Sequence, residues 1–102
     1  MQYFNEAKAP PGDPYILDLD MPSKNNVYSQ ELPIGTKKFT VTVTDTAGYN
    51  INFNPTEGDL TKFESLFPNQ AYNMNGILLS RQTFINIQAD TDNVKAKISY
   101  WL

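Results

Sequence analysis

The sequence predicts an all-β protein: a small antiparallel β-sandwich, of jelly-roll or Ig-like form, with an extended N-terminal arm and at most one short helix near residues 59–67. Three observations support this fold class. Several segments alternate apolar and polar residues with a period of two, which is typical of strands with one buried face. Turn-forming residues separate these segments at short intervals. Three prolines and a glycine fall within residues 6–15, which suits an extended chain better than a helix or a central strand.

The length and the charge distribution indicate one domain with two unlike parts. A chain of 102 residues is long enough for a single core, and its 13% of aromatic residues can bury a large area with few side chains. The first 33 residues carry the whole net charge of −3, while the charges of the remaining residues balance. We therefore expect residues 1–33 to form an extended N-terminal arm with one or two short strands, and residues 34–102 to form the β-sandwich core.

Two segments of the arm have the pattern of short strands. In YILDLD, at residues 15–20, Tyr15, Leu17 and Leu19 are expected on one face and the acidic residues on the other. This segment is either a short edge strand or becomes ordered only on a partner. The segment VYSQEL, at residues 27–32, is a second short strand that ends at a proline.

The clearest strand pattern begins the predicted core. Residues 38–44 alternate Phe39, Val41 and Val43 with threonines, and β-branched residues favour strands. Residues 49–54 alternate apolar residues with asparagines. Because the residues DTAG between these two runs favour a tight turn, they are predicted to form a β-hairpin.

A second hairpin is predicted at the C-terminal end. Residues 83–89 and 94–101 both alternate, and the residues DTDN between them favour a turn. Lys95 and Lys97 fall on the solvent face of the last strand, where they would discourage pairing with another chain. Trp101 falls on that same face, so either the terminus bends and buries its ring or a partner covers it.

The helix near residues 59–67 is predicted from the spacing of its apolar residues. Asp59 can cap its first turn and Pro68 stops it, which leaves about two turns. The residues at helical spacing are Leu60, Phe63, Leu66 and Phe67.

The composition excludes several classes of function. The chain has no cysteine and no histidine, which rules out Ser-His-Asp and Cys-His mechanisms, disulfides and the commonest zinc ligands. No basic stripe is present, so nucleic acid is not an expected partner. No apolar run approaches the ~20 residues of a membrane span, and the N-terminus lacks the apolar region of a signal peptide. We expect no enzymatic activity, no cofactor and no membrane partner.

Two acidic groups were weighed as sites of chemistry. Asp18 and Asp20 lie on one face of a strand, where they can bind a hard cation, act as an acid–base pair, or simply be solvated. Asp90, Asp92 and Asn93 place oxygens at alternate positions, as a calcium loop does, but the required glycine and glutamate are missing. We interpret the first group as solvated charges and the second as a turn.

The aromatic residues of the arm have three interpretations. They can form a platform for a sugar or peptide, contact a neighbouring subunit, or pack on their own domain. The arm and the terminus together provide the candidate partner-binding residues. These are Tyr3, Phe4, Pro10, Pro11, Tyr15, Leu17, Tyr28 and Trp101.

Two runs that cover about two thirds of the chain resemble a group of small virion proteins of tailed bacteriophages. They are LPIGTKKFTVTVTDTAGYNINF and YNMNGILLSRQTFINIQADTDNVKAKISYW. The shared plan is a proline- and glycine-led strand, a partner strand, a G-x-L step, a polar strand, and a terminal strand ending in Tyr-Trp. These features correspond to Pro33–Phe39, Tyr49–Phe53, Gly76–Leu79, Phe84–Ala89 and Val94–Trp101.

The resemblance implies a non-enzymatic capsid decoration (cement) or head-associated protein. Such a protein is made in the host cytoplasm and resides on the capsid surface of the virion. Its partners are the major capsid protein or neighbouring virion subunits, and we expect a homo-oligomer, with a trimer favoured. Removing residues 1–14 should leave the fold intact and abolish particle binding. The alternative is a glycan- or receptor-binding β-module of a phage fibre or tail, which the aromatic residues and the asparagine-rich surface also suit.

Overall fold

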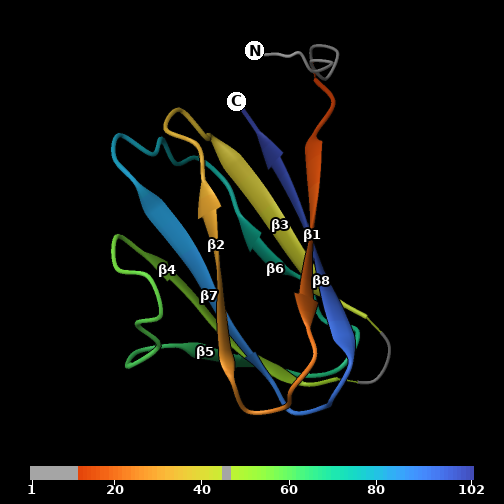
Figure 1. Ribbon diagram of the computed structural model, residues 1–102. Helices are drawn as coiled ribbons and strands as arrows, with labels where there is room; N and C mark the ends of the chain where they lie inside the picture. Colours follow the sequence, from red (N-terminus) through yellow and green to blue (C-terminus); the bar gives the residue numbers. More distant parts are fainter. Residues whose placement is uncertain (1–11, 45–46) are drawn as a thin grey trace.

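The protein is an all-β domain (Figure 1). A computed structural model describes residues 12–44 and 47–102, and these residues form eight strands and no helix. Just over half of these described residues lie in strands, in keeping with the all-β fold that the alternating pattern predicts. The strands are β1 (Tyr15–Met21), β2 (Val27–Leu32), β3 (Lys38–Val43), β4 (Tyr49–Asn54), β5 (Glu64–Leu66), β6 (Tyr72–Met74), β7 (Thr83–Ala89) and β8 (Val94–Trp101).

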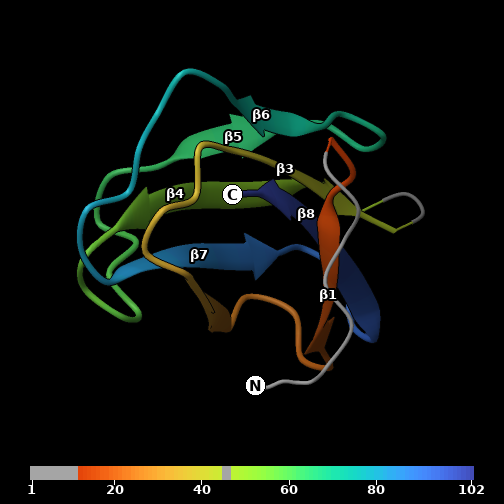
Figure 2. The ribbon, with the colours of Figure 1, turned by 90° about the horizontal axis from the view of Figure 1, so that it is seen from above.

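The strands form two antiparallel sheets that pack face to face (Figure 2). In the described residues, one sheet has the order β1-β8-β3-β6 and the other has the order β2-β7-β4-β5. The pairing is nested, because β1 pairs with β8, β2 with β7, β3 with β6 and β4 with β5. The chain is thus one long antiparallel ribbon folded over itself. The β3–β8 pair joins two segments of this ribbon side by side in one sheet, and the β4–β7 pair does the same in the other sheet. This strand order is that of an eight-stranded jelly roll.

The core between the sheets contains the residues that alternation placed there. Phe39 and Val41 of β3, Ile85 and Ile87 of β7, and Ile98 of β8 are all 0% exposed. The inward faces predicted for these strands are therefore confirmed, and burying such aliphatic and aromatic side chains stabilises the fold by roughly 1.5–3 kcal/mol each.

Both predicted hairpins are wrong. Residues 38–44 and 49–54 belong to β3 and β4, which lie in different sheets, and the same is true of β7 and β8. In each case the two strands that follow one another in the sequence therefore belong to facing sheets. Alternation identifies the buried face of a strand, but it does not identify the strand that pairs with it.

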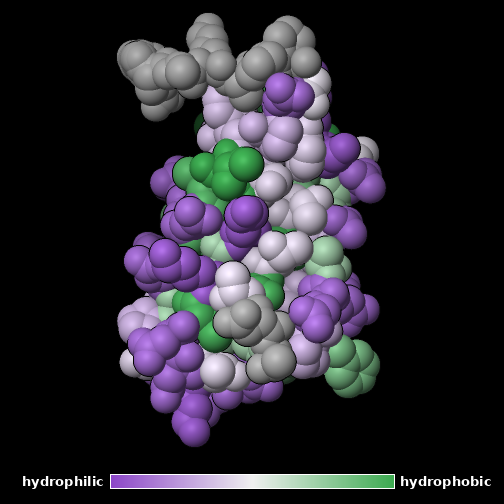
Figure 3. Space-filling view, turned by 90° about the vertical axis from the view of Figure 1, so that its right-hand side faces the viewer, coloured by the Kyte–Doolittle hydropathy of each residue, from purple (hydrophilic) through white to green (hydrophobic). Residues whose placement is uncertain are grey.

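The lysines of β8 have a different role from the one predicted. Because β8 lies between β1 and β3, Lys95 and Lys97 protect no sheet edge. They lie opposite Asp20 and Asp18 across the β1–β8 pair, and the Lys95 Nζ is 3.8 Å from Asp20 Oδ1. Figure 3 shows the side of the molecule that carries β1 and β8, where hydrophilic side chains surround separate hydrophobic ones.

The predicted short helix is also absent. Residues 59–67 form turns followed by β5, and Phe63 and Phe67 are exposed rather than buried. The carbonyl of Asp59, which would accept a backbone N–H within a helix, instead accepts three side-chain amides at 2.8–3.1 Å. These amides belong to Asn52, Asn54 and Asn86.

Residues 15–21 and 27–32, which the sequence analysis placed in the N-terminal arm, form β1 and β2 at one edge of each sheet. Met21 and Leu32, at the ends of these strands, are 1% and 0% exposed and belong to the core. A chain that started at Ile34 would therefore leave an edge of β8 and an edge of β7 unpaired.

Candidate functional site

The described members of the predicted partner-binding set are integrated into the domain. Tyr15 stacks on Tyr100, with ring centroids 5.2 Å apart and an interplanar angle of 16°. Leu17 packs against the core, and the Tyr28 hydroxyl accepts the backbone N–H of Ser23 at 3.1 Å. The other members of the set, apart from the C-terminal tryptophan, lie outside the described residues. They are Tyr3, Phe4, Pro10 and Pro11.

Trp101 is half-buried and is covered by its own chain. Its Nε1 donates to the carbonyl of Gly12 at 3.2 Å, and the Lys38 Nζ lies 4.2 Å from the centroid of its ring. A cation at this distance over an indole face is a favourable contact. The ring therefore contacts its own domain while part of its surface stays exposed.

One end of the sandwich carries exposed aliphatic side chains, and we refer to Ile34, Leu78 and Leu102 as the exposed apolar end. Their exposed fractions are 66%, 67% and 54%. The three segments that hold them are neighbours, because Gly35 N donates to the Leu79 carbonyl at 2.7 Å and Lys37 N donates to the Trp101 carbonyl at 2.8 Å. The C-terminus and the β2–β3 connection lie at this end in Figure 1.

No pattern in the sequence indicates the exposed apolar end. Each of its members is a single apolar residue in a loop or at a terminus, and single exposed apolar residues are common on protein surfaces. Their grouping depends on backbone hydrogen bonds between segments more than 40 residues apart, as between Gly35 and Leu79.

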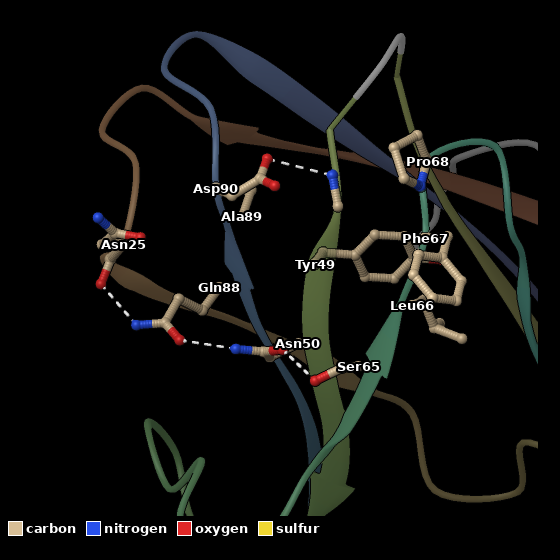
Figure 4. Close-up of a pocket in the computed structure, with 11 residues that line it drawn as sticks. Asn25, Tyr49, Asn50, Ser65, Leu66, Phe67, Pro68, Gln88, Ala89 and Asp90 are labelled. Carbon is tan, nitrogen blue, oxygen red and sulfur yellow. Dashed lines mark hydrogen bonds between the residues drawn. The ribbon is translucent and has the colours of Figure 1, made fainter.

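Polar side chains form a second surface feature on the outer face of the β2-β7-β4-β5 sheet. Gln88 Nε2 donates to the carbonyl of Asn25 at 2.7 Å, and Asn50 Nδ2 donates to Gln88 Oε1 at 3.1 Å. Ser65 Oγ then donates to Asn50 Oδ1 at 2.7 Å. Figure 4 shows this chain of hydrogen bonds, which we name the amide row and define as Gln88, Asn50 and Ser65.

A second row of polar side chains, centred on Asn86, lies on the same face but is covered by other residues. Asn86 is 0% exposed, and its amide accepts Ser29 Oγ at 2.5 Å and the Gly58 N–H at 2.9 Å while it donates to Asn52 Oδ1 at 3.0 Å. The connection between β4 and β5 covers it, through the Thr56 and Asp59 carbonyls. This row is part of the structure of the domain, whereas the amide row is not covered in this way.

The amide row lies along a pocket of about 260 Å³ (Figure 4). Phe67, 79% exposed, lines one side, and Asp90 lies near the other end. The Asp90 Oδ1 accepts the Gly48 N–H at 3.1 Å and the Thr91 hydroxyl at 2.8 Å. A Cβ atom at position 48 would lie 3.0 Å from Asp90 Oδ2, so glycine leaves room for this carboxylate.

Tyr49 forms the buried wall behind this pocket. Its ring is 3% exposed, and its hydroxyl donates to the carbonyl of Gln70 and lies 3.4 Å from the carbonyl of Val41. Burial disfavours the charged phenolate and raises the pKa of Tyr49 to about 12. The hydroxyl is therefore neutral at ordinary pH and acts as a structural donor.

The two candidate acidic groups make contacts within the domain. Asp18 and Asp20 face lysines, and the Asp92 Oδ1 accepts the Lys24 N–H at 2.7 Å in the turn after β7. Hydrogen bonds from the Thr61 hydroxyl and N–H lower the pKa of Asp59. Among the residues that the structure describes, no group of three or more His, Cys, Asp or Glu is placed to hold a metal ion. In the same residues, no helix is long and apolar enough to cross a membrane.

Comparisons with known proteins assign the chain to no family. The chain matches no protein family, no curated protein and no solved structure.

Proposed function

We propose that this protein is a non-enzymatic virion structural protein, a capsid decoration or cement subunit that binds and stabilises a phage head lattice. The observation that carries the proposal is the exposed apolar end. Aliphatic side chains exposed on neighbouring segments offer apolar area that another protein can bury. The sequence resemblance supplies the setting, which is the capsid surface.

The fold and its chemistry are compatible with this function. Jelly rolls occur in viral capsid domains, although a fold alone does not determine a function. Asp90 and Asp92 accept backbone N–H groups in turns, and Asp18 and Asp20 lie opposite lysines of β8. The proposed partners are the major capsid protein or neighbouring virion subunits, including copies of this chain, with a trimer favoured.

Co-sedimentation with purified heads of the phage that carries the gene tests the proposal. We expect the double variant Ile34→Ser/Leu78→Ser to bind at least about tenfold more weakly, since two exposed aliphatic groups lose their contact with the partner. The matched control is Val27→Ser, which replaces an aliphatic residue of 38% exposure at the start of β2, toward the opposite end of the sandwich from the exposed apolar end (Figure 1). Equal binding by the double variant and the control would contradict the proposal.

Two further measurements address the setting. Because β1 starts at Tyr15, a chain without residues 1–14 retains all eight described strands, and we expect it to fold but to lose particle binding. Mass spectrometry of purified virions should detect the chain, and light scattering of the isolated protein should report a trimer. Absence from the virions would overturn the capsid assignment.

The second candidate function is a glycan- or receptor-binding β-module of a phage fibre or tail. The amide row is the observation that favours it, because uncharged donors and acceptors on an open surface suit hydroxylated ligands. Antibody labelling of intact particles distinguishes the two settings, since it places the chain either on the shell or on a fibre.

A further inference from the structure

We infer that the pocket beside the amide row is a binding site for one neutral saccharide ring. Its elements are Asn50, Gln88 and Ser65 along one side, the Asp90 carboxylate at one end and the Phe67 ring at another side. The inference deepens the second candidate function, but the site also suits a capsid-bound protein. It lies near the start of β4, toward the opposite end of the sandwich from the exposed apolar end (Figure 1).

The amide row retains hydrogen-bonding capacity after its internal bonds are made. A primary amide has two N–H donors and two acceptor lone pairs on its oxygen. Within the described residues, Asn50 and Gln88 each use one donor and one acceptor position in the row. Ser65 donates its only proton to Asn50 and keeps both lone pairs. The remaining groups place donors and acceptors next to one another, which suits the adjacent hydroxyls of a sugar.

The Asp90 carboxylate adds a stronger acceptor. Its Oδ1 is held by the Gly48 N–H and the Thr91 hydroxyl, while its Oδ2 has no hydrogen-bond partner among the described residues. Hydrogen bonds to an ionised acceptor are shorter and stronger than bonds between neutral groups. A sugar hydroxyl donating to Oδ2 would therefore contribute more than one donating to the amide row.

Phe67 provides an apolar surface for the C–H face of a sugar ring. Its side chain is 79% exposed and lines the pocket, so the face of the ring is open to a ligand. The neighbouring Pro68 restricts the backbone, so the ring is carried on a stiff segment. A flat apolar ring next to donors and acceptors is the combination that an amphipathic pyranose requires.

The charge of the pocket selects neutral sugars. Asp90 is the charged residue among the described residues that line it, and no lysine or arginine is present there. A sialic acid or a sugar phosphate would bring its own negative charge toward Asp90 with no cation to compensate. The ligand class is therefore neutral hexoses or N-acetylhexosamines.

The hydrogen bonds within the amide row hold its side chains in place before a ligand arrives. Such preorganisation reduces the entropy lost on binding. The pocket is nevertheless small, at about 260 Å³, and a single ring has few atoms to contribute. We therefore expect a dissociation constant of about 1 mM for a monosaccharide, and tighter binding only where several copies engage one glycan surface.

Titration followed by ¹H–¹⁵N NMR tests the inference with defined probes. Glucose, galactose, mannose and N-acetylglucosamine are each added to the full chain, with N-acetylneuraminic acid and glucose 6-phosphate as charged comparisons. We expect at least one neutral sugar to shift the side-chain amide signals of Asn50 and Gln88 and the backbone signal of Phe67. No shift by any neutral sugar at about 50 times the expected dissociation constant, or stronger shifts by the charged sugars, would overturn it.

Matched variants locate the site. Phe67→Ala should weaken the binding of the responding sugar about three- to tenfold, whereas the control Phe63→Ala, an exposed ring outside the pocket, should leave it unchanged. Asn50→Ala should weaken it about tenfold, and the control Asn73→Ala, an amide on the other sheet, should not. Equal effects of a variant and its control would place the sugar elsewhere and contradict the inference.

The outcomes of this experiment and of the capsid experiment are distinguishable. The variant Ile34→Ser/Leu78→Ser should still bind the sugar but lose capsid binding. Asn50→Ala should bind the sugar more weakly but keep capsid binding. Retained spectra of both variants, with well-dispersed signals, would show that neither result comes from unfolding.

Discussion

The two sheets share one core but differ on their outer faces. The outer face of β1-β8-β3-β6 carries Asp18 and Asp20 opposite Lys97 and Lys95, and these charged side chains remain in water. The outer face of β2-β7-β4-β5 carries amides and hydroxyls that bond to one another, and at Asn86 they are fully buried.

This difference shows how side chains of similar polarity take different roles. Solvated charges need no protein partner, so the first face depends little on its neighbours. A buried amide is costly unless its donors and acceptors are satisfied, so the second face forms a connected polar layer. Where the β4–β5 connection covers this layer it stabilises the fold, and where the layer stays open it can receive a ligand.

The largest expected effect comes from breaking the covered part of that layer. Asn86→Ala leaves the Asn52 oxygen without its partner, removes one of the two acceptors of the Gly58 N–H and opens a cavity, so we expect a loss of about 3 kcal/mol in the free energy of unfolding. Urea denaturation measures it. The matched control is Asn73→Ala on the other sheet, whose amide accepts the Thr40 hydroxyl at an exposed site and should cost less than about 0.5 kcal/mol. Similar losses in both variants would remove the contrast between the faces.

An intermediate effect is expected at Tyr49, whose hydroxyl lies at a contact between the layers. Tyr49→Phe removes the donor to the Gln70 carbonyl and should lower the free energy of unfolding by about 1 kcal/mol at neutral pH. The pH dependence is a second readout. An unfolded tyrosine ionises near pH ~10, and the folded side chain has a pKa of about 12.

The sign of this pH effect follows from linkage. The stabilisation is complete below pH ~10, where the group is neutral in both states, and it is lost as the pH rises toward the folded pKa. We expect the unfolding free energy of the native protein to fall more steeply above pH ~10 than that of Tyr49→Phe. The unfolding free energy of Tyr49→Phe should still fall at alkaline pH, by a smaller amount, because burial also raises the pKa of Tyr72. Identical alkaline profiles would show that Tyr49 ionises freely.

The sequence was sufficient to predict the fold class and most of the buried positions, but not the strand pairing. Alternation in residues 38–44 and 94–101 depends on neighbouring residues, so it can be read locally. Pairing depends on which strands meet in three dimensions, and the nested order of a jelly roll places β1 beside β8 across nearly the whole chain. The turns DTAG and DTDN looked like hairpin turns because their residues favour any reversal of direction.

The candidate sites were less predictable than the fold. An asparagine-rich surface follows from composition, but the separation of a closed row at Asn86 from an open one at Asn50 depends on the position of the β4–β5 connection. That connection was predicted as part of a helix, because Phe63 and Phe67 have helical spacing. The amides that hold the Asp59 carbonyl come from β4 and β7, and no local pattern reveals them.

The smallest expected effect tests the charged face. Asp20→Asn removes the partner of Lys95, but the two side chains are 79% and 63% exposed and 3.8 Å apart. Exposed ion pairs contribute little because water and salt screen them, so we expect a change of about 0.5 kcal/mol or less, and less still at high salt. Urea denaturation at low and high salt measures it, with Asp18→Asn as the neighbouring control. A loss above about 1 kcal/mol that persists in high salt would mean that the charged side chains depend on one another as strongly as the amides of the other face do. The difference between the two sheets would then have to lie in the loops that cover them rather than in the chemistry of their side chains.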